Sequence, residues 1–142
     1  HYFLEQRRQT EPLAMMAAFQ QEEGRLAACL AAHDYKDPAW HCHSYLARGR
    51  YHEQLVRFFD LFPREQFLIL PSEQLFAQPL ATVTRCLQFL GLPVDGFSPS
   101  LEVVNSGSNK SPVAPEVTAY LTDYFAPHNE KLWDLLGERY PW

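Results

Sequence analysis

The sequence lacks a basic surplus, and it lacks a long apolar run. Its 12 Lys and Arg residues are outnumbered by 17 Asp and Glu residues, which gives a formal net charge of −5. That balance excludes broad binding to nucleic acid or to an anionic membrane surface, although it leaves room for a local pocket that takes one small anion. No apolar run approaches the roughly 20 residues that a membrane-spanning helix needs, so the sequence predicts no membrane span.

Cysteine is also scarce and carries no motif. The three cysteines, Cys29, Cys42 and Cys86, form an odd set without recurrent spacing. We therefore expect no disulfide scaffold, and a reducing compartment such as the cytoplasm is the expected location. The run His41–His43 does not match the C-x-x-C or H-x(3–5)-H spacing of zinc sites, so we predict no bound metal.

An initiator methionine and a signal peptide are absent as well. The first residues, starting at His1, show no basic segment followed by an apolar one. We therefore expect the chain to begin inside a longer protein. Its 142 residues suit one domain over 1–142, and 46% apolar with 20% charged residues is typical of a globular protein.

Hydrophobic spacing predicts a mostly helical chain. One helix has especially regular spacing, with Tyr51 as its first apolar position, Ser44 as its N-cap and Pro63 ending it. Gly91 and Gly137 are expected to close two later helices. The predicted helices cover 11–32, 44–62, 79–90, 116–125 and 129–136, with a loop at 34–43.

One segment is predicted to form a strand. Residues 66–71 carry the apolar run Phe67–Leu70 between Pro63 and Pro71, a pattern typical of a parallel strand that is buried on both faces. A single buried strand would leave its backbone N–H and C=O groups unpaired. Partner strands are therefore expected before His1, and we predict an α/β fold of which this chain is the C-terminal part.

The stretch from Leu92 to Pro115 has little predicted regular structure. Long loops inside compact domains are usually functional or disordered. Hydroxyl groups, backbone N–H groups and one cation occur together here, as a phosphate site requires. The alternative is an ordinary solvated surface loop. The candidate residues are Ser106, Gly107, Ser108, Asn109, Lys110 and Ser111.

An ordered set of short motifs runs through the second half of the chain. The set comprises Arg48-Gly49-Arg50-Tyr51, Phe62-Pro63 before the predicted strand, Glu73-Gln74-Leu75, Pro79, Phe89-Leu90-Gly91-Leu92-Pro93, Tyr124-Phe125-Ala126-Pro127-His128-Asn129 and the final Pro141-Trp142. From about residue 45 to 142, this order resembles the C-terminal half of the sulfotransferase domain of heparan-sulfate-type and related bacterial sulfotransferases.

The resemblance implies a P-loop-like, three-layer α/β fold and transfer of a sulfuryl group. The donor would be 3′-phosphoadenosine 5′-phosphosulfate (PAPS), and the acceptor a hydroxyl or amine, most often of a saccharide. In this family the phosphosulfate loop and the catalytic base lie in the N-terminal half, so no catalytic residue is expected in this chain and the chain alone is expected to be inactive. The loop Ser106–Ser111 would form a second wall of the nucleotide site, with Lys110 as its cation.

Two interpretations fit the residues that are candidates for binding the acceptor. Arg48, Tyr51 and Trp40 could line the acceptor cleft. Alternatively, Tyr51 is the first core position of its helix, and Arg48 and Arg50 are both solvated. A different function also fits the sequence, namely a non-catalytic helical module for protein interaction. The expected partners are the nucleotide donor, a saccharide or small-molecule acceptor and the missing N-terminal half.

Overall fold

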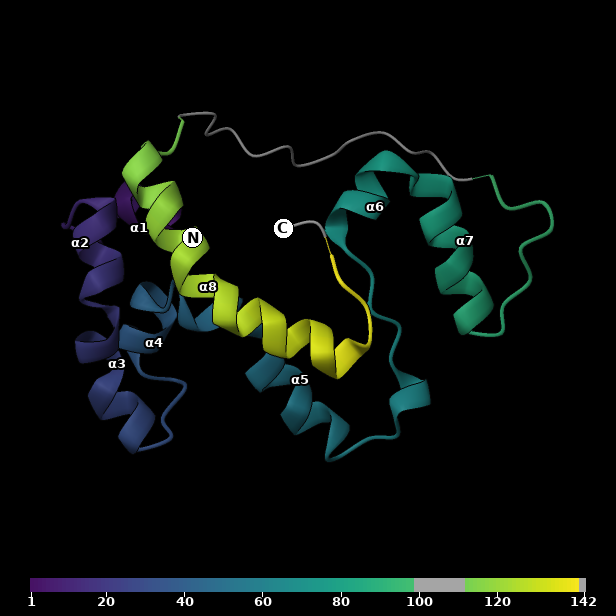
Figure 1. Ribbon diagram of the computed structural model, residues 1–142, viewed down its shortest axis with the longest axis horizontal. Coiled ribbons are helices and arrows are strands. Elements are labelled where there is room, and N and C mark those ends of the chain that lie inside the picture. The colour runs from purple at the N-terminus through teal and green to yellow at the C-terminus, as the bar shows by residue number, and fades with distance from the viewer. Residues whose placement is uncertain (99–111, 141–142) are drawn as a thin grey trace. The chain divides into compact units, whose positions relative to one another are not determined.

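The computed structural model describes residues 1–98 and 112–140 (Figure 1). The chain divides into two compact units. The first unit contains His1–Leu55 and Asn109–Arg139, and the second contains Val56–Ser108 and Tyr140–Trp142.

The first unit is helical. Its elements are α1 (Tyr2–Arg7), α2 (Met15–Gln20), α3 (Glu22–Ala31), α4 (Pro38–His43), a short 3₁₀ helix (Ala47–Gly49), the start of α5 (Tyr51–Phe59) and α8 (Pro115–Leu136). Gly137 follows α8 with a φ of 70°, which is the left-handed conformation that glycine adopts easily. The expectation that Gly137 closes this helix is confirmed.

Two apolar clusters hold the first unit together. The larger one joins α1, α2 and α8 with the segment after α4, through Tyr2, Ala18, Phe19, Leu46 and Val117. The smaller one sets Leu26 and Cys29 of α3 against Ala47. The N-terminal half of α8 therefore packs on helices that lie about a hundred residues earlier in the chain, as Figure 1 shows.

Buried carboxylates add to this packing. Glu11 accepts hydrogen bonds from Arg25 Nη1 at 2.6 Å, the Tyr45 hydroxyl at 2.7 Å and the Leu13 backbone N–H at 2.9 Å. The Nδ1 atom of His43 lies 3.3 Å from the same carboxylate. Burial raises the pKa of Glu11, but these hydrogen bonds outweigh it and lower the pKa from 4.5 to about 2.

Glu22 fastens the start of α3 to the segment that precedes α5. Its carboxylate accepts three backbone N–H groups, from Tyr45 at 2.9 Å, Leu46 at 2.6 Å and Ala47 at 2.8 Å. The side chain is buried, so these bonds replace water that the carboxylate loses.

Several expected helix boundaries are wrong. Residues 11–32 do not form one helix, because Met15–Gln20 and Glu22–Ala31 are separate helices with Gln21 between them. Residues 34–43 are not all loop, since Asp37 accepts a hydrogen bond from the Ala39 N–H at 2.6 Å and starts α4. Ser44 is not an N-cap, because its hydroxyl donates to the Trp40 carbonyl at the end of α4.

Pro127 does not divide α8. Two helices were expected on either side of it, yet Pro115–Leu136 form one helix with Pro127 inside. Proline removes one intrahelical hydrogen bond, at a cost of roughly 3 kcal/mol. Apolar contacts on both sides of Pro127, at Phe125 and Leu132 among others, keep the helix continuous.

The second unit contains the end of α5, a 3₁₀ turn (Arg64–Gln66), α6 (Ser72–Ala77) and α7 (Pro79–Phe89). The buried Thr82 hydroxyl donates to the carbonyls of Gln74 and Gln78, which fixes α7 against α6. Gly91 follows α7 with a φ of 69°, as expected for a closing glycine.

The expected strand at 66–71 is not confirmed. Phe67 has extended backbone angles (φ −117°, ψ 125°), but residues 67–70 are only half-buried and no strand is assigned in the described parts of the chain. The Phe67 ring packs against Phe58, Phe59 and Phe62. A strand requires a hydrogen-bonded partner, and the described residues supply none, so the segment remains extended and unpaired.

We expect Glu11→Gln to destabilise the protein near neutral pH. The pKa of Glu11 is lower in the folded chain, so its stabilising contribution is complete above pH 4.5 and is lost as the pH falls toward 2. The shift corresponds to about 3 kcal/mol. Chemical denaturation at pH 7 should show a loss of this order, and the difference from wild type should shrink toward pH 3. Glu23→Gln, at an exposed neighbouring carboxylate, is the control. Equal losses in both variants would contradict the assignment.

Two glycines should respond to alanine with opposite signs. A Cβ at Gly49 would lie 2.6 Å from Cζ of Phe125, whereas one at Gly24 would meet nothing within 4 Å. Gly49→Ala should therefore lower the free energy of unfolding by about 1–3 kcal/mol. Gly24→Ala, inside α3, should raise it by roughly 0.5–1 kcal/mol. Adding Phe125→Leu should relieve part of the Gly49→Ala loss in thermal denaturation.

Candidate functional site

The Arg48-Gly49-Arg50-Tyr51 segment lies between two hollows of the first unit. It runs from the 3₁₀ helix into the first residue of α5 and faces α8. Gly49 touches the Phe125 ring of α8 so closely that no side chain fits between them. This contact fixes the turn on α8 and directs the flanking side chains into separate surroundings.

The Arg48 guanidinium forms hydrogen bonds within the protein. Its Nε donates to the Ser44 hydroxyl at 2.7 Å, and its Nη2 donates to the carbonyls of His41 at 3.2 Å and Trp40 at 3.5 Å. The guanidinium therefore satisfies the C-terminal end of α4. Arg48 and Trp40 are therefore in contact, but Arg48 binds the backbone carbonyl of Trp40 and not its ring.

The Trp40 side chain is half-buried and packs edge-on against Tyr35, with ring centroids 5.1 Å apart. This contact packs the loop between α3 and α4 against α4. Whether Arg48 and Trp40 touch an acceptor stays a prediction.

Arg50 lines the first hollow, a cavity of about 290 Å³. Its Nη1 lies 3.2 Å from Glu53, while its Nε is buried and has no acceptor among the described residues. We call this cavity the Arg50 hollow. Its other walls come from α2, α3, the 3₁₀ helix region and α8, and comprise Phe19, Gln20, Glu22, Glu23, Leu26, Leu30, Leu46, Ala47, Tyr120 and Tyr124.

Tyr51 lies beside the second hollow, a shallow groove of about 310 Å³. The residue is 56% exposed, so the interpretation that it is the first core position of its helix is wrong. We call this the Tyr51 groove. The other lining residues are Gly49, Leu121, Thr122, Phe125 and Asn129. An exposed phenol ring beside a hydroxyl and an amide is an arrangement suited to a polar ligand with one apolar face.

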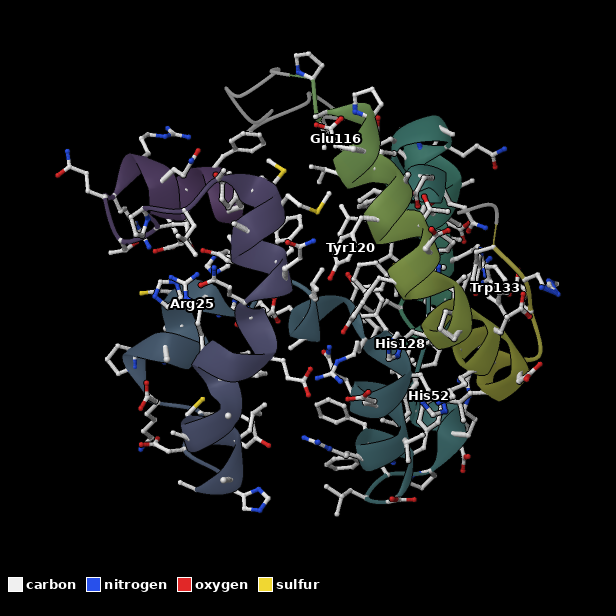
Figure 2. All side chains as sticks on the ribbon, turned by 60° about the vertical axis from the view of Figure 1, so that its left-hand side comes forward. Arg25, His52, Glu116, Tyr120, His128 and Trp133 are labelled. Carbon is white, nitrogen blue, oxygen red and sulfur yellow. The ribbon has the colours of Figure 1, made fainter. Side chains whose placement is uncertain are left out.

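A contact between His128 of α8 and Glu53 of α5 was not predicted from the sequence. His128 Nδ1 lies 4.0 Å from Glu53, and its ring packs on Tyr124 at 5.3 Å. Burial lowers the pKa of His128, and the positive charge of Arg50 lowers it further. Figure 2 labels His128 on α8 and His52 on α5, the helix that carries Glu53. The only sequence signal was the Tyr124–Asn129 motif, which did not reveal that Glu53 would be its neighbour.

The predicted nucleotide loop, Ser106–Ser111, lies outside the described residues. In the parts that the structure does describe, no group of three or more His, Cys, Asp or Glu side chains is placed to hold a metal ion. Across those same ranges, no helix has the length and hydropathy of a membrane span. All three cysteines are free.

Comparison with known proteins gives consistent matches. The sulfotransferase domain family matches residues 5–111. The membrane-associated sulfotransferase kil1 of Dictyostelium discoideum is 32% identical over 100 residues, which are 68% of this chain and 20% of that protein. The crystal structure of a sulfotransferase from Alicyclobacillus acidocaldarius superposes with a TM-score of 0.73 at 27% identity. The match covers 98% of this chain and 49% of that one.

The chain thus spans about a fifth of the curated relative and about half of the solved structure. The family match begins within α1, extends beyond α7 to residue 111 and includes the Arg48–Tyr51 turn. The chain therefore belongs to the sulfotransferase domain family.

Proposed function

We propose that this chain is the C-terminal part of an enzyme that transfers a sulfuryl group from PAPS to a hydroxyl or amine, with a saccharide as the acceptor. The family match over residues 5–111 is the observation that carries the proposal. The match to about half of a solved sulfotransferase supports a division of the site between this chain and an N-terminal half.

The proposed roles follow that division. The N-terminal half would supply the phosphosulfate loop and the base that takes the proton of the acceptor, because this sequence has no Gly-rich loop with a lysine at P-loop spacing. The loop Ser106–Ser111 would contact the 3′-phosphate side of the donor. There, backbone N–H groups and Lys110 would donate to phosphate oxygens.

Positioning and electrostatic stabilisation would supply most of the rate, as in phosphoryl transfer. The sulfur–oxygen bond to the nucleotide phosphate breaks while the acceptor oxygen or nitrogen bonds to sulfur. The leaving group is adenosine 3′,5′-bisphosphate. Cationic and N–H donors at the nucleotide site would stabilise the charge that develops on its 5′-phosphate.

Tyr51 is the acceptor-side residue that the geometry favours. Its ring is exposed beside the Tyr51 groove, where Thr122 and Asn129 add polar groups. Arg48 is already bonded to Ser44 and to carbonyls of α4, so its proposed part is to hold the turn that presents Tyr51.

A non-catalytic interaction module is the second candidate. The second unit favours it in one respect, because large apolar side chains are exposed there, including Leu61 at 75% and Phe76 at 74%. Such surfaces often mark contacts with another protein element. Under the first proposal, the N-terminal half of the same domain would cover them.

Nucleotide binding distinguishes the two candidates. Adenosine 3′,5′-bisphosphate should bind the full-length protein, and Lys110→Ala should weaken binding by about tenfold, the effect of losing one charge-assisted hydrogen bond. Calorimetric titration measures both affinities. Lys36→Ala, at an exposed lysine before α4, is the matched control and should bind like wild type. Absence of binding to the wild-type protein would refute the enzyme proposal, whereas equal affinity in Lys110→Ala would refute only the lysine assignment.

The acceptor assignment can be tested through steady-state kinetics. With an unsulfated glucosamine–uronate oligosaccharide as acceptor, Tyr51→Ala should raise KM by about tenfold because the ring contact is lost. The KM for PAPS should stay unchanged. Phe58→Ala, which removes another exposed ring of α5 that does not line the groove, is the comparison. If the two variants change the acceptor KM alike, the Tyr51 groove is not an acceptor contact.

A further inference from the structure

The Tyr51 groove has its walls on two elements. One wall comes from the turn before α5 together with Tyr51, and the other comes from α8. The Oε1 atom of Glu53 lies 3.2 Å from Nη1 of Arg50 and 4.0 Å from Nδ1 of His128. The contact with His128 thus connects the segment that carries Tyr51 to α8. We infer that His128 is a positioning residue of the groove, which keeps the two walls together while its ring is neutral and lets them separate when the ring takes up a proton.

The packing of the His128 ring links it to the wall of the groove. The ring centroid lies 5.3 Å from that of Tyr124 and 6.4 Å from that of Phe125. Phe125 in turn lies so close to Gly49 that a Cβ there would stand 2.6 Å from its Cζ. Because Phe125 and Gly49 both line the groove, a displacement of the His128 ring would reach the groove through Phe125.

The surroundings of His128 oppose a positive charge on its ring. Burial is the main cause, and the guanidinium of Arg50 is the next. Lys131 on α8 and His52 on α5 act in the same direction, whereas Glu53 favours the charged ring. Arg50 already pairs with the Glu53 oxygen that His128 faces. The pKa of His128 therefore lies below 6.5, and a protonated ring is better accommodated where water can reach it.

Pro127 gives α8 a place to bend beside His128. Proline has no backbone N–H, so it removes one hydrogen bond of the helix, and helices bend at such positions. The groove residues of α8 lie on both sides of Pro127, with Leu121, Thr122 and Phe125 before it and Asn129 after it. A bend at Pro127 would therefore change the distance between Asn129 and Tyr51 without unfolding the helix.

The inference rests on the proposed function only in that the groove contacts the acceptor. The response of α8 to the His128 proton requires neither donor nor acceptor. It can therefore be measured in the absence of both, which separates a failure of this inference from a failure of the proposed function.

The first test is the pH dependence of KM for the glucosamine–uronate oligosaccharide in the full-length protein. If only the neutral form of His128 gives an intact groove, the apparent affinity falls with the neutral fraction. Relative to His128→Asn, the KM of wild type should rise by up to about tenfold per pH unit below the pKa of His128. Asparagine keeps an N–H donor but does not titrate. His33→Asn, at an exposed histidine after α3, should follow wild type.

The second test is hydrogen–deuterium exchange of the full-length protein without ligands. Comparing wild type with His128→Asn at the same pH cancels the intrinsic pH dependence of exchange. In peptides that cover residues 128–136, the ratio of wild-type to variant exchange should rise about threefold between pH 7.5 and pH 5. Peptides from α3 should show a constant ratio.

Glu53→Gln provides a second variant that keeps the histidine. It removes the carboxylate that favours the charged ring, so it should lower the pKa of His128 further. Both the rise in KM and the rise in exchange, corrected for intrinsic rates, should then begin at a lower pH than in wild type. A merely structural role of His128 would not produce this displacement, and the comparison stands even if His128→Asn does not fold.

The inference is overturned if wild type and His128→Asn have parallel pH profiles, or if Glu53→Gln responds at the same pH as wild type. A pH-dependent exchange ratio with parallel KM profiles would also overturn it, because α8 would then move without affecting the acceptor. Absence of any turnover would contradict the proposed function, and the exchange profiles would then decide whether α8 responds to His128.

Discussion

The carboxylate of Glu11 is the interaction on which the first unit depends. It lies in the loop between α1 and α2 and binds Arg25 of α3 and Tyr45 after α4. Three segments that lie apart in the sequence thus share one charged centre. An isolated buried carboxylate would be strongly unfavourable, so the helices can take this arrangement only when all of its donors are in place. Glu22 is likewise a buried carboxylate whose hydrogen-bond donors are all within the protein. Its donors are backbone N–H groups, and they fix the segment that leads into the Arg48–Tyr51 turn.

These two centres determine where the candidate site lies. Glu22 fixes Leu46 and Ala47, and the turn that follows is pressed against Phe125 of α8. Successive residues of the turn then differ in role: Arg48 closes α4, Arg50 lines one hollow and Tyr51 lies beside the other. A short, fixed turn can therefore place neighbouring side chains in different surroundings.

Sequence reasoning recovered the parts of the molecule that local patterns determine. The positive-φ glycines at the ends of α7 and α8 were predictable because few other residues adopt that conformation. The family followed from the order of short motifs. The division at Gln21 and the continuity of α8 through Pro127 were not predictable, since tertiary contacts decide both.

The same limit applies to the site. Tyr51 fitted the apolar spacing of its helix, but burial depends on what packs against it, and the structure leaves it exposed. His128 and Arg50 come within reach of the same Glu53 oxygen only because α8 returns to the start of α5. No spacing in the sequence encodes an encounter between residues some 75 positions apart. The loop Ser106–Ser111 remains a prediction from composition and resemblance.

The extended segment after the Arg64–Gln66 turn has a practical consequence for anyone handling this polypeptide. Residues 67–70 combine β-favouring apolar side chains with backbone groups that lack a ladder partner in the described structure. Such a stretch is a template for edge-to-edge association between copies. A charged substitution at Ile69 would oppose such association, because like charges on neighbouring copies repel one another.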